Sequence, residues 1–385
     1  MPNYKSPIFS KLPKVGTTIF TKMSAMANKH EALNLSQGFP DFPIDPKLID
    51  CTLKAMKSGY NQYAPMPGLV GLREAIAEKI EDAYSIAYHP ETEITITSGA
   101  TQAIFTAMAA FVKEEDEVII FTPAYDCYQP AIELLGGKPV FVQLKSPDYK
   151  INWEEVKKLI SQRTRMIIIN TPHNPTGTLL SEEDLKELEK ITAHSEIIIL
   201  SDEVYEHIVF DGQKHASICR NKGLADRSIA VFSFGKTFHI TGWKMGYCIG
   251  PKQLMVEFRK VHQFNVFSSN HPLQHALTEY LNDSENYLSL GSFYQKKRDV
   301  FLSAITGSRF KVIPSKGTYF QLLDYSSISD ENDVMFAERL VHEYKIASIP
   351  VSVFYNSPLD EKVLRFCFAK KEQTLEEVAK ILSKI

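Results

Sequence analysis

One lysine of this chain lies among residues that favour burial. Lys236 stands in the run SFGKTF, with Phe234 and Phe238 on either side. Burial disfavours the ammonium form, and the neutral lysine amine is the form that makes Schiff bases with carbonyl compounds. A solvent-exposed loop lysine is the ordinary alternative, but its aromatic neighbours make that the weaker interpretation. The segment therefore predicts a nucleophilic lysine.

A carboxylate follows a run of four apolar residues at 197–200. Asp202 comes two residues after this run, and Tyr205 follows it closely. A carboxylate at the end of a buried strand needs a cationic or hydrogen-bonding partner. Asp202 could hold a pyridine nitrogen protonated while Tyr205 reaches a neighbouring oxygen. A helix cap or a structural ion pair explains Asp202 equally well at this point.

An arginine interrupts the apolar run at 363–368. Arg365 is flanked by Leu364 and Phe366, in a segment typical of a strand buried on both faces. A buried arginine is almost never left unpaired. Its planar fork suits a carboxylate bidentately, so we expect Arg365 to bind a substrate carboxylate. A buried ion pair with an acid of the chain itself is the second interpretation.

Alternating strands and helices must position these side chains. Strands are expected at 93–97, 117–121, 139–144, 165–170, 196–200, 228–233 and 244–249, with helices at 100–112 and 181–193 and long helical stretches at 251–305. Ser181 with Asp184 three residues later is a capping-box pattern. Such alternation predicts an α/β fold with a mostly parallel sheet covered on both faces.

Polar residues follow five of these strands. They are Ser98, Gly99, Ala100, Thr101 and Gln102 after the first, Tyr125, then His173 and Asn174, then Asp202, and finally Ser233 with Lys236. Ligands of open α/β sheets bind outside the carboxyl ends of the strands. The glycine at a helix N-terminus after the first strand could receive a phosphate, although a simple helix cap is the stronger interpretation of that turn alone.

Three parts of the chain are expected. The opening, residues 1–45, is rich in Pro, Gly and Ser and is predicted to be an irregular arm that packs with a small domain. Residues 46–306 form the large domain, whose first part, 46–88, is helical. Residues 307–385 form a smaller α/β domain with strands at 311–314, 318–323, 346–350 and 363–368 and helices at 333–344 and 374–383.

Composition restricts the classes of function. The net charge is −3 and the chain contains no block of Lys and Arg residues, which argues against a nucleic-acid partner. No run approaches the roughly 20 apolar residues of a membrane helix, and the first residues do not resemble a secretory signal. The five cysteines form no CxxC pair, and no HxxxH or HExxH spacing supports a metal site. A cytoplasmic protein without a metal is predicted.

These motifs together resemble the class-I, fold-type-I pyridoxal-phosphate (PLP) aminotransferases over nearly the whole chain. The resemblance is carried by NQY at 61–63, SGATQ at 98–102, NTPHNPTG at 170–177, SDEVY at 201–205, SFGK at 233–236, TGWKMGY at 241–247 and LRF at 364–366. The run NLSQGFPD at 34–41 and the TPHNP loop are most similar to the branch of bacterial methionine aminotransferases and kynurenine aminotransferases (glutamine transaminase K). The resemblance implies a large domain with a mostly parallel seven-stranded sheet and a smaller C-terminal domain.

The resemblance also implies roles for single residues. Lys236 would form the Schiff base with PLP, and Asp202 would pair with the pyridine nitrogen. The remaining positions are these: Asn174 and Tyr205 at the ring hydroxyl, Tyr125 on the ring face, Ser98, Gly99, Ala100, Thr101, Ser233 and Lys244 around the phosphate, Tyr63 reaching the phosphate from the other subunit of a homodimer, Arg365, Asn174 and Gly38 at the substrate carboxylate, and Phe20 and Phe267 at the substrate side chain.

The expected activity is transamination of methionine, glutamine or aromatic amino acids, including kynurenine, with a 2-oxo acid by ping-pong kinetics. A β-lyase acting on cysteine conjugates or cystathionine would use the same Lys236 and Asp202 and is the nearer alternative. A non-catalytic regulator with a ligand-sensing aminotransferase-like domain is the more distant one, because the chain has no additional helix-turn-helix or basic region.

Overall fold

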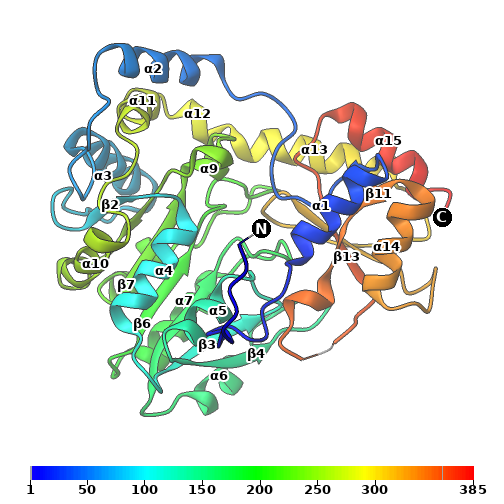
Figure 1. Ribbon diagram of the computed structural model, residues 1–385, viewed down its shortest axis with the longest axis horizontal. Coiled ribbons are helices and arrows are strands. Elements are labelled where there is room, and N and C mark those ends of the chain that lie inside the picture. The colour runs from blue at the N-terminus through cyan, green and yellow to red at the C-terminus, as the bar shows by residue number, and fades with distance from the viewer. Residues whose placement is uncertain (1, 358) are drawn as a thin grey trace.

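A seven-stranded sheet forms the centre of the larger part of the molecule (Figure 1). The computed structural model describes residues 2–357 and 359–385. The strand order is β2-β8-β7-β6-β5-β3-β4. The strands are β2 (Ile94–Thr97), β3 (Glu117–Thr122), β4 (Lys138–Gln143), β5 (Thr164–Asn170), β6 (Ile198–Asp202), β7 (Ser228–Ser233) and β8 (Gly246–Ile249). All neighbours pair in parallel except β8, which is antiparallel to both β2 and β7.

Helices cover both faces of this sheet, so its strands are apolar on both sides. On β5, Ile168 belongs to one buried cluster, whereas Ile167 and Ile169 belong to the other. The first cluster contains side chains of α4 (Ala100–Phe111), α5 (Tyr128–Leu134) and α10 (Lys252–Asn265). The second contains side chains of α3 (Val70–Tyr84), α6 (Trp153–Leu159), α7 (Glu182–Thr192), α8 (Lys222–Ala225) and α11 (His271–Leu281). This two-sided burial explains the continuous Ile and Val runs by which the strands were predicted.

A second, smaller unit contains a four-stranded antiparallel sheet. Its order is β12-β13-β10-β9, with β9 (Lys311–Ile313), β10 (Phe320–Asp324), β12 (Ile349–Pro350) and β13 (Val363–Cys367). Helices α14 (Asp333–Tyr344) and α15 (Glu372–Leu382) belong to this part of the chain, and α13 (Leu290–Ala304) packs on α15. The contact between α13 and α15 spans the domain boundary predicted at 306, which stays a prediction.

The prediction of an irregular N-terminal arm was wrong for part of that segment. Residues Ile19–Lys29 form helix α1, and Leu33–Asn34 form β1, which pairs in parallel with β11 (Ile346–Ala347). Thr18 caps the helix by accepting a hydrogen bond from the Thr21 amide. Met23 and Ala27, one helical turn apart, are its buried residues. The spacing of Met23 and Ala27 is typical of a helix, but the Pro and Gly residues of the surrounding segment favoured the prediction of irregular structure.

Other boundaries differ by a few residues. The strand expected at 346–350 is split into β11 and β12, which belong to different sheets. The helical region at 46–88 contains α2 (Pro46–Lys57) and α3 with an irregular segment between them. The remaining short helices are α9 (Phe234–Thr237) and α12 (Glu285–Leu288). Among the described residues, no helix is both long and apolar enough to cross a membrane.

Candidate active site

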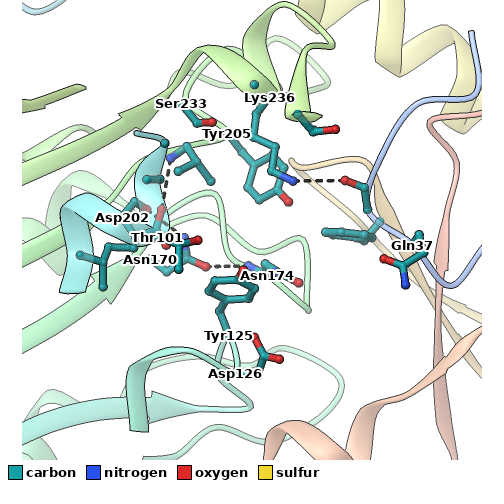
Figure 2. A pocket seen from close by; sticks show the side chains of 18 of the residues that line it. Gln37, Thr101, Tyr125, Asp126, Asn170, Asn174, Asp202, Tyr205, Ser233 and Lys236 are labelled. Atoms are coloured by element: carbon teal, nitrogen blue, oxygen red, sulfur yellow. Dashed lines mark hydrogen bonds between the residues drawn. The ribbon is translucent and has the colours of Figure 1, made fainter. Parts of the chain in front are cut away.

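The predicted polar residues gather around one cavity of about 330 Å³ at the carboxyl ends of the parallel strands (Figure 2). The predicted residues that line it are Phe20, Gly38, Gly99, Ala100, Thr101, Tyr125, Asn174, Asp202, Tyr205, Ser233, Lys236, Lys244 and Arg365. They come from the N-terminal segment, from five junctions of the large sheet and from β13 of the smaller one. The cavity therefore lies between the two units of the fold.

Three predicted site residues do not line this cavity. The backbone N–H of Ser98 donates to the Gln102 side chain, 3.0 Å away, as part of the turn before α4. Tyr63 and Phe267 lie on the surface, with exposed fractions of 79% and 45%, and their rings meet edge to face at 5.0 Å. Neither of these two aromatic rings completes the cavity of its own chain.

Lys236 is carried by α9, the short helix that follows β7. Its Nζ lies 3.1 Å from the Gly38 carbonyl oxygen and 2.9 Å from the Tyr319 hydroxyl. Removal of the amine from bulk water lowers the pKa of Lys236 to about 8, and the nearby Arg365 acts in the same direction. A substantial neutral fraction therefore exists near neutral pH, as expected for a nucleophilic lysine.

Asp202 is the last residue of β6 and lines the cavity. Its Oδ2 accepts a hydrogen bond of 2.5 Å from the Tyr128 hydroxyl, and its Oδ1 accepts one of 3.4 Å from the Val204 amide. No cation of the described residues forms an ion pair with it. Burial raises the pKa of Asp202 to about 6, although the hydrogen bond from Tyr128 opposes this rise. Asp202 is thus a buried carboxylate that can still receive a positive group.

The N-terminus of α4 forms another wall of the cavity. Gly99, its N-cap, has φ of 78°, a value open to glycine that brings the backbone close to Lys244. A Cβ at position 99 would lie 3.6 Å from the Lys244 Nζ. Free amides at a helix N-terminus together with an ammonium group and the nearby Ser233 hydroxyl form an environment suited to an anion.

Arg365 lies on β13 and is 1% exposed. Its guanidinium donates to Asn174 Oδ1 at 2.7 Å and to the Ser36 carbonyl oxygen at 3.1 Å, and it stacks 3.9 Å from the centre of the Phe320 ring. Its Nε has no partner, and no carboxylate within the described residues forms an ion pair with it. The described residues therefore give no direct support to the second interpretation, a buried ion pair with an acid of the chain; Asp126 lines the same cavity but makes no such pair.

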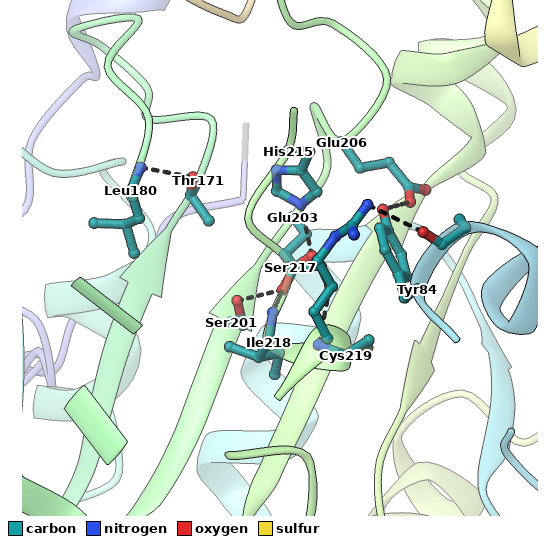
Figure 3. A network of polar contacts seen from close by, with 12 residues as sticks. Tyr84, Thr171, Leu180, Ser201, Glu203, Glu206, His215, Ser217, Ile218 and Cys219 are labelled. Atoms are coloured by element: carbon teal, nitrogen blue, oxygen red, sulfur yellow. Dashed lines mark hydrogen bonds and ion pairs between the residues drawn. The ribbon is translucent and has the colours of Figure 1, made fainter. Parts of the chain in front are cut away.

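Two buried acids of the segment that follows Asp202, Glu203 and Glu206, take part in polar networks (Figure 3). Glu203, which is completely buried, accepts from the Ser201 hydroxyl at 2.8 Å and the Ile218 amide at 3.1 Å and contacts His215 at 2.7 Å. Glu206 pairs with the buried Lys79 at 2.6 Å and accepts from Tyr84 at 2.7 Å. The charge of Lys79 overcomes burial and keeps the pKa of Glu206 below its usual range.

The cavity residues Asp126 and Phe320 were not predicted, nor were Tyr128 and Tyr319, which hydrogen-bond to residues of its lining. Tyr128 and Asp126 follow the predicted Tyr125 in the same junction, and this proximity was the signal that could have found them. Tyr319 and Phe320 lie in and beside a strand of the smaller unit, where an aromatic residue looks like ordinary core. Only the packing of that unit against the N-terminal segment brings Phe320 to the cavity and Tyr319 to the Lys236 amine.

Comparisons with known proteins agree with this geometry. The model of the family "Aminotransferase class I and II" matches residues 30–382. The chain is 48% identical over 377 residues to the methionine aminotransferase of Escherichia coli, covering 98% of both chains, and 34% identical to the kynurenine–oxoglutarate transaminase of Dictyostelium discoideum, covering 96% of this chain and 94% of that one.

Solved structures give the same result. One of them is the structure of YbdL from Escherichia coli, for which a methionine aminotransferase function was identified. It superposes with a TM-score of 0.97 at 47% identity, over 99% of this chain and 100% of that one. The N-succinyldiaminopimelate aminotransferase of Mycobacterium tuberculosis superposes with a TM-score of 0.94 at 35% identity, over 98% and 100%. The chain therefore belongs to the class I and II aminotransferases and is a pyridoxal 5'-phosphate-dependent transaminase.

Proposed function

We propose that this enzyme transfers the amino group of L-methionine to a 2-oxo acid, and that glutamine and aromatic amino acids, including kynurenine, are further donors. The observation that carries the proposal is Arg365, a buried cation with an unpaired Nε in the same cavity as the Lys236 amine. An α-amino acid carries its carboxylate and its amine on the same carbon, so Arg365 can bind the carboxylate while the Cα–H bond lies near the Lys236 amine. The methionine and kynurenine relatives support the choice of donors.

The residues of the cavity fit PLP. The α4 N-terminus, with Ser233 and Lys244, would hold the phosphate, and the buried Asp202 would pair with the pyridine nitrogen. The other proposed contacts are Tyr125 on the ring face, and Asn174 and Tyr205 at the ring hydroxyl. When bound, PLP supplies an electron sink for the electrons released at the substrate Cα.

The side chains of the protein perform the remaining tasks. Lys236, whose pKa lies at about 8, would act as the general base that removes the proton from the substrate Cα and would hold that proton on its Nζ for the return step. The Asp202 carboxylate would stabilise a positive charge on the pyridine nitrogen of a bound PLP. Arg365 and Asn174 hold the substrate carboxylate and thereby orient the Cα–H bond toward the amine. The same residues act on the 2-oxo acid in reverse, which predicts ping-pong kinetics.

Aromatic rings would form the pocket for the substrate side chain. The ring of Phe20 lies 5.4 Å and that of Phe354 5.2 Å from the Arg365 guanidinium, so an apolar wall adjoins the carboxylate site. We propose that a second copy of the chain supplies Phe267 to this pocket and Tyr63 to the phosphate. The exposure of both rings on this chain supports such a homodimer. The five cysteines, none in a disulfide, are compatible with the proposed cytoplasmic location.

Absorption spectroscopy tests the proposal. The purified enzyme with PLP is expected to show a visible band from the lysine-bound cofactor, and L-methionine without a 2-oxo acid is expected to convert it to the pyridoxamine form. Lys236→Ala should lack the band, whereas Lys260→Ala, at an exposed ion pair with Glu257, should keep it. A band that persists with methionine would contradict the proposed donor, and pyruvate with ammonia from a thioether substrate would indicate β-lyase chemistry.

A further inference from the structure

The hydroxyl of Tyr319 forms a triangle of hydrogen bonds with the Lys236 amine and the backbone of Gly38. The Lys236 Nζ lies 2.9 Å from the Tyr319 oxygen and 3.1 Å from the Gly38 carbonyl oxygen. The Tyr319 hydroxyl lies 2.5 Å from the same carbonyl. The dashed line from Lys236 in Figure 2 marks its bond to that carbonyl. Three separate segments of the chain therefore meet at the amine.

The direction of each hydrogen bond follows from the chemistry of the groups. The Gly38 carbonyl can only accept, and the Tyr319 hydroxyl lies closer to it, at 2.5 Å, than to the amine, at 2.9 Å, so we assign the Tyr319 proton to the bond with the carbonyl. The Tyr319 oxygen is then left as an acceptor for the amine. A neutral lysine amine has two N–H bonds and one lone pair. The bonds to Tyr319 and Gly38 use both N–H groups, and the lone pair occupies the remaining tetrahedral direction.

We propose that Tyr319 is a positioning residue for the transamination reaction: by accepting one N–H of the neutral Lys236 amine, it aims the lone pair of that amine at the substrate Cα proton. This inference rests on the proposed role of Lys236 as general base. Tyr319 does not itself line the cavity, and it acts on the reaction only through the direction of the Lys236 lone pair.

The surroundings of Tyr319 favour this passive role. The side chain is completely buried, and its ring packs edge to face on Tyr205 at 5.1 Å. Burial raises the pKa of Tyr319 well above its ordinary value, so the hydroxyl stays protonated and does not compete with Lys236 for the substrate proton. The other groups whose charges act on the pKa of the amine are Cys367, Arg365, Asp202 and Lys244, and the Tyr205 ring lies 5.6 Å from its Nζ.

Tyr319→Phe is the informative variant, because phenylalanine retains the ring and removes only the hydroxyl. Tyr294→Phe is the matched control. The Tyr294 ring is also fully buried and lies 5.6 Å from that of Tyr319, but its hydroxyl has no hydrogen-bond partner among the described residues. Both substitutions remove one oxygen from the same aromatic cluster.

Two readouts are needed, one of them independent of the cofactor. In the apoprotein, acylation of Lys236 by acetic anhydride is followed by mass spectrometry as a function of pH, which gives the pKa of the free amine. In the holoenzyme, stopped-flow absorbance gives the maximal rate of the half-reaction with L-methionine.

In Tyr319→Phe the free amine should become more reactive toward acetic anhydride at pH 7, while the half-reaction with L-methionine becomes slower. An acceptor favours the ammonium form, so its loss should lower the titration midpoint of Lys236 from about 8 and raise its acylation rate at pH 7. The maximal rate of the half-reaction should nevertheless fall, by roughly 10- to 100-fold, because the lone pair is no longer aimed. Tyr294→Phe should match the wild type in both.

A midpoint or a maximal rate in Tyr319→Phe that equals that of Tyr294→Phe would overturn the inference. So would a midpoint that rises toward the ordinary lysine value, since this would report general loosening and entry of water. Failure of the proposed function looks different: the wild-type holoenzyme itself would then show no cofactor band or no reaction with methionine.

Discussion

Replacement of Arg365 by lysine tests the proposed recognition of the substrate carboxylate. In the structure, the guanidinium uses two nitrogens on Asn174 and the Ser36 carbonyl while its Nε remains unpaired. Burial lowers the pKa of Arg365 to about 10, so the group stays charged at neutral pH. A lysine at this position would keep the positive charge but lose the fork that can engage both carboxylate oxygens.

The expected loss follows from the number of bonds. Lysine retains one charged hydrogen bond to the carboxylate and loses one, which is worth about 1.5–3 kcal/mol. Since about 1.4 kcal/mol corresponds to a tenfold change, binding of a carboxylate should weaken roughly 10- to 200-fold. The value depends on the bond lost and not on net charge, which the substitution leaves unchanged.

Competitive inhibitors measure this loss without the chemical step. The inhibition constant of 4-(methylthio)butanoate, which is methionine without its amino group, is compared with that of the corresponding alcohol. Arg365→Lys should weaken binding of the carboxylate and leave binding of the alcohol nearly unchanged, and Arg339→Lys, at a half-buried pair with Glu331 away from the cavity, should affect neither. Equal weakening of the acid and the alcohol would refute the reasoning, because it would mean that Arg365 supports the fold of the site and does not bind the carboxylate.

Two further predictions concern buried charges. Because burial raises the pKa of Asp202 to about 6, its carboxyl group is protonated below that pH and carries no charge to pair with a pyridinium. PLP affinity of the apoprotein, measured by fluorescence titration, should therefore rise by up to about tenfold in total between pH 5 and 7, and this part of the rise should vanish in Asp202→Asn. Lys79→Met leaves Glu206 buried without its cation and should lower the free energy of unfolding by about 3–5 kcal/mol in chemical denaturation, whereas Lys54→Met, at an exposed pair, should cost no more than about 1 kcal/mol. Similar losses in both lysine variants would contradict a dominant role of burial.

Much of the large sheet could be predicted because its strands are short apolar runs separated by helical periodicity. The polar residues after these runs, such as Asp202 and Lys236, could be expected to lie together, since the carboxyl ends of parallel strands share one edge of a sheet. The antiparallel direction of β8 was not predictable in this way, because a strand buried on both faces has the same apolar pattern in either direction. Helix α1 was missed although its spacing was present.

Sequence by itself determined the chemical groups of this enzyme and the junctions that carry them. Lys236, Asp202 and Arg365 could be selected because each is a polar group in a segment that must be buried, and burial of such groups requires partners. The tertiary structure alone decided which partners they have. Tyr128 beneath Asp202, Tyr319 beside Lys236 and the contact of Arg365 with Asn174, 191 residues away, depend on packing between distant segments. Local patterns specify which face of an element is buried, but the neighbour that covers that face is set by the fold as a whole.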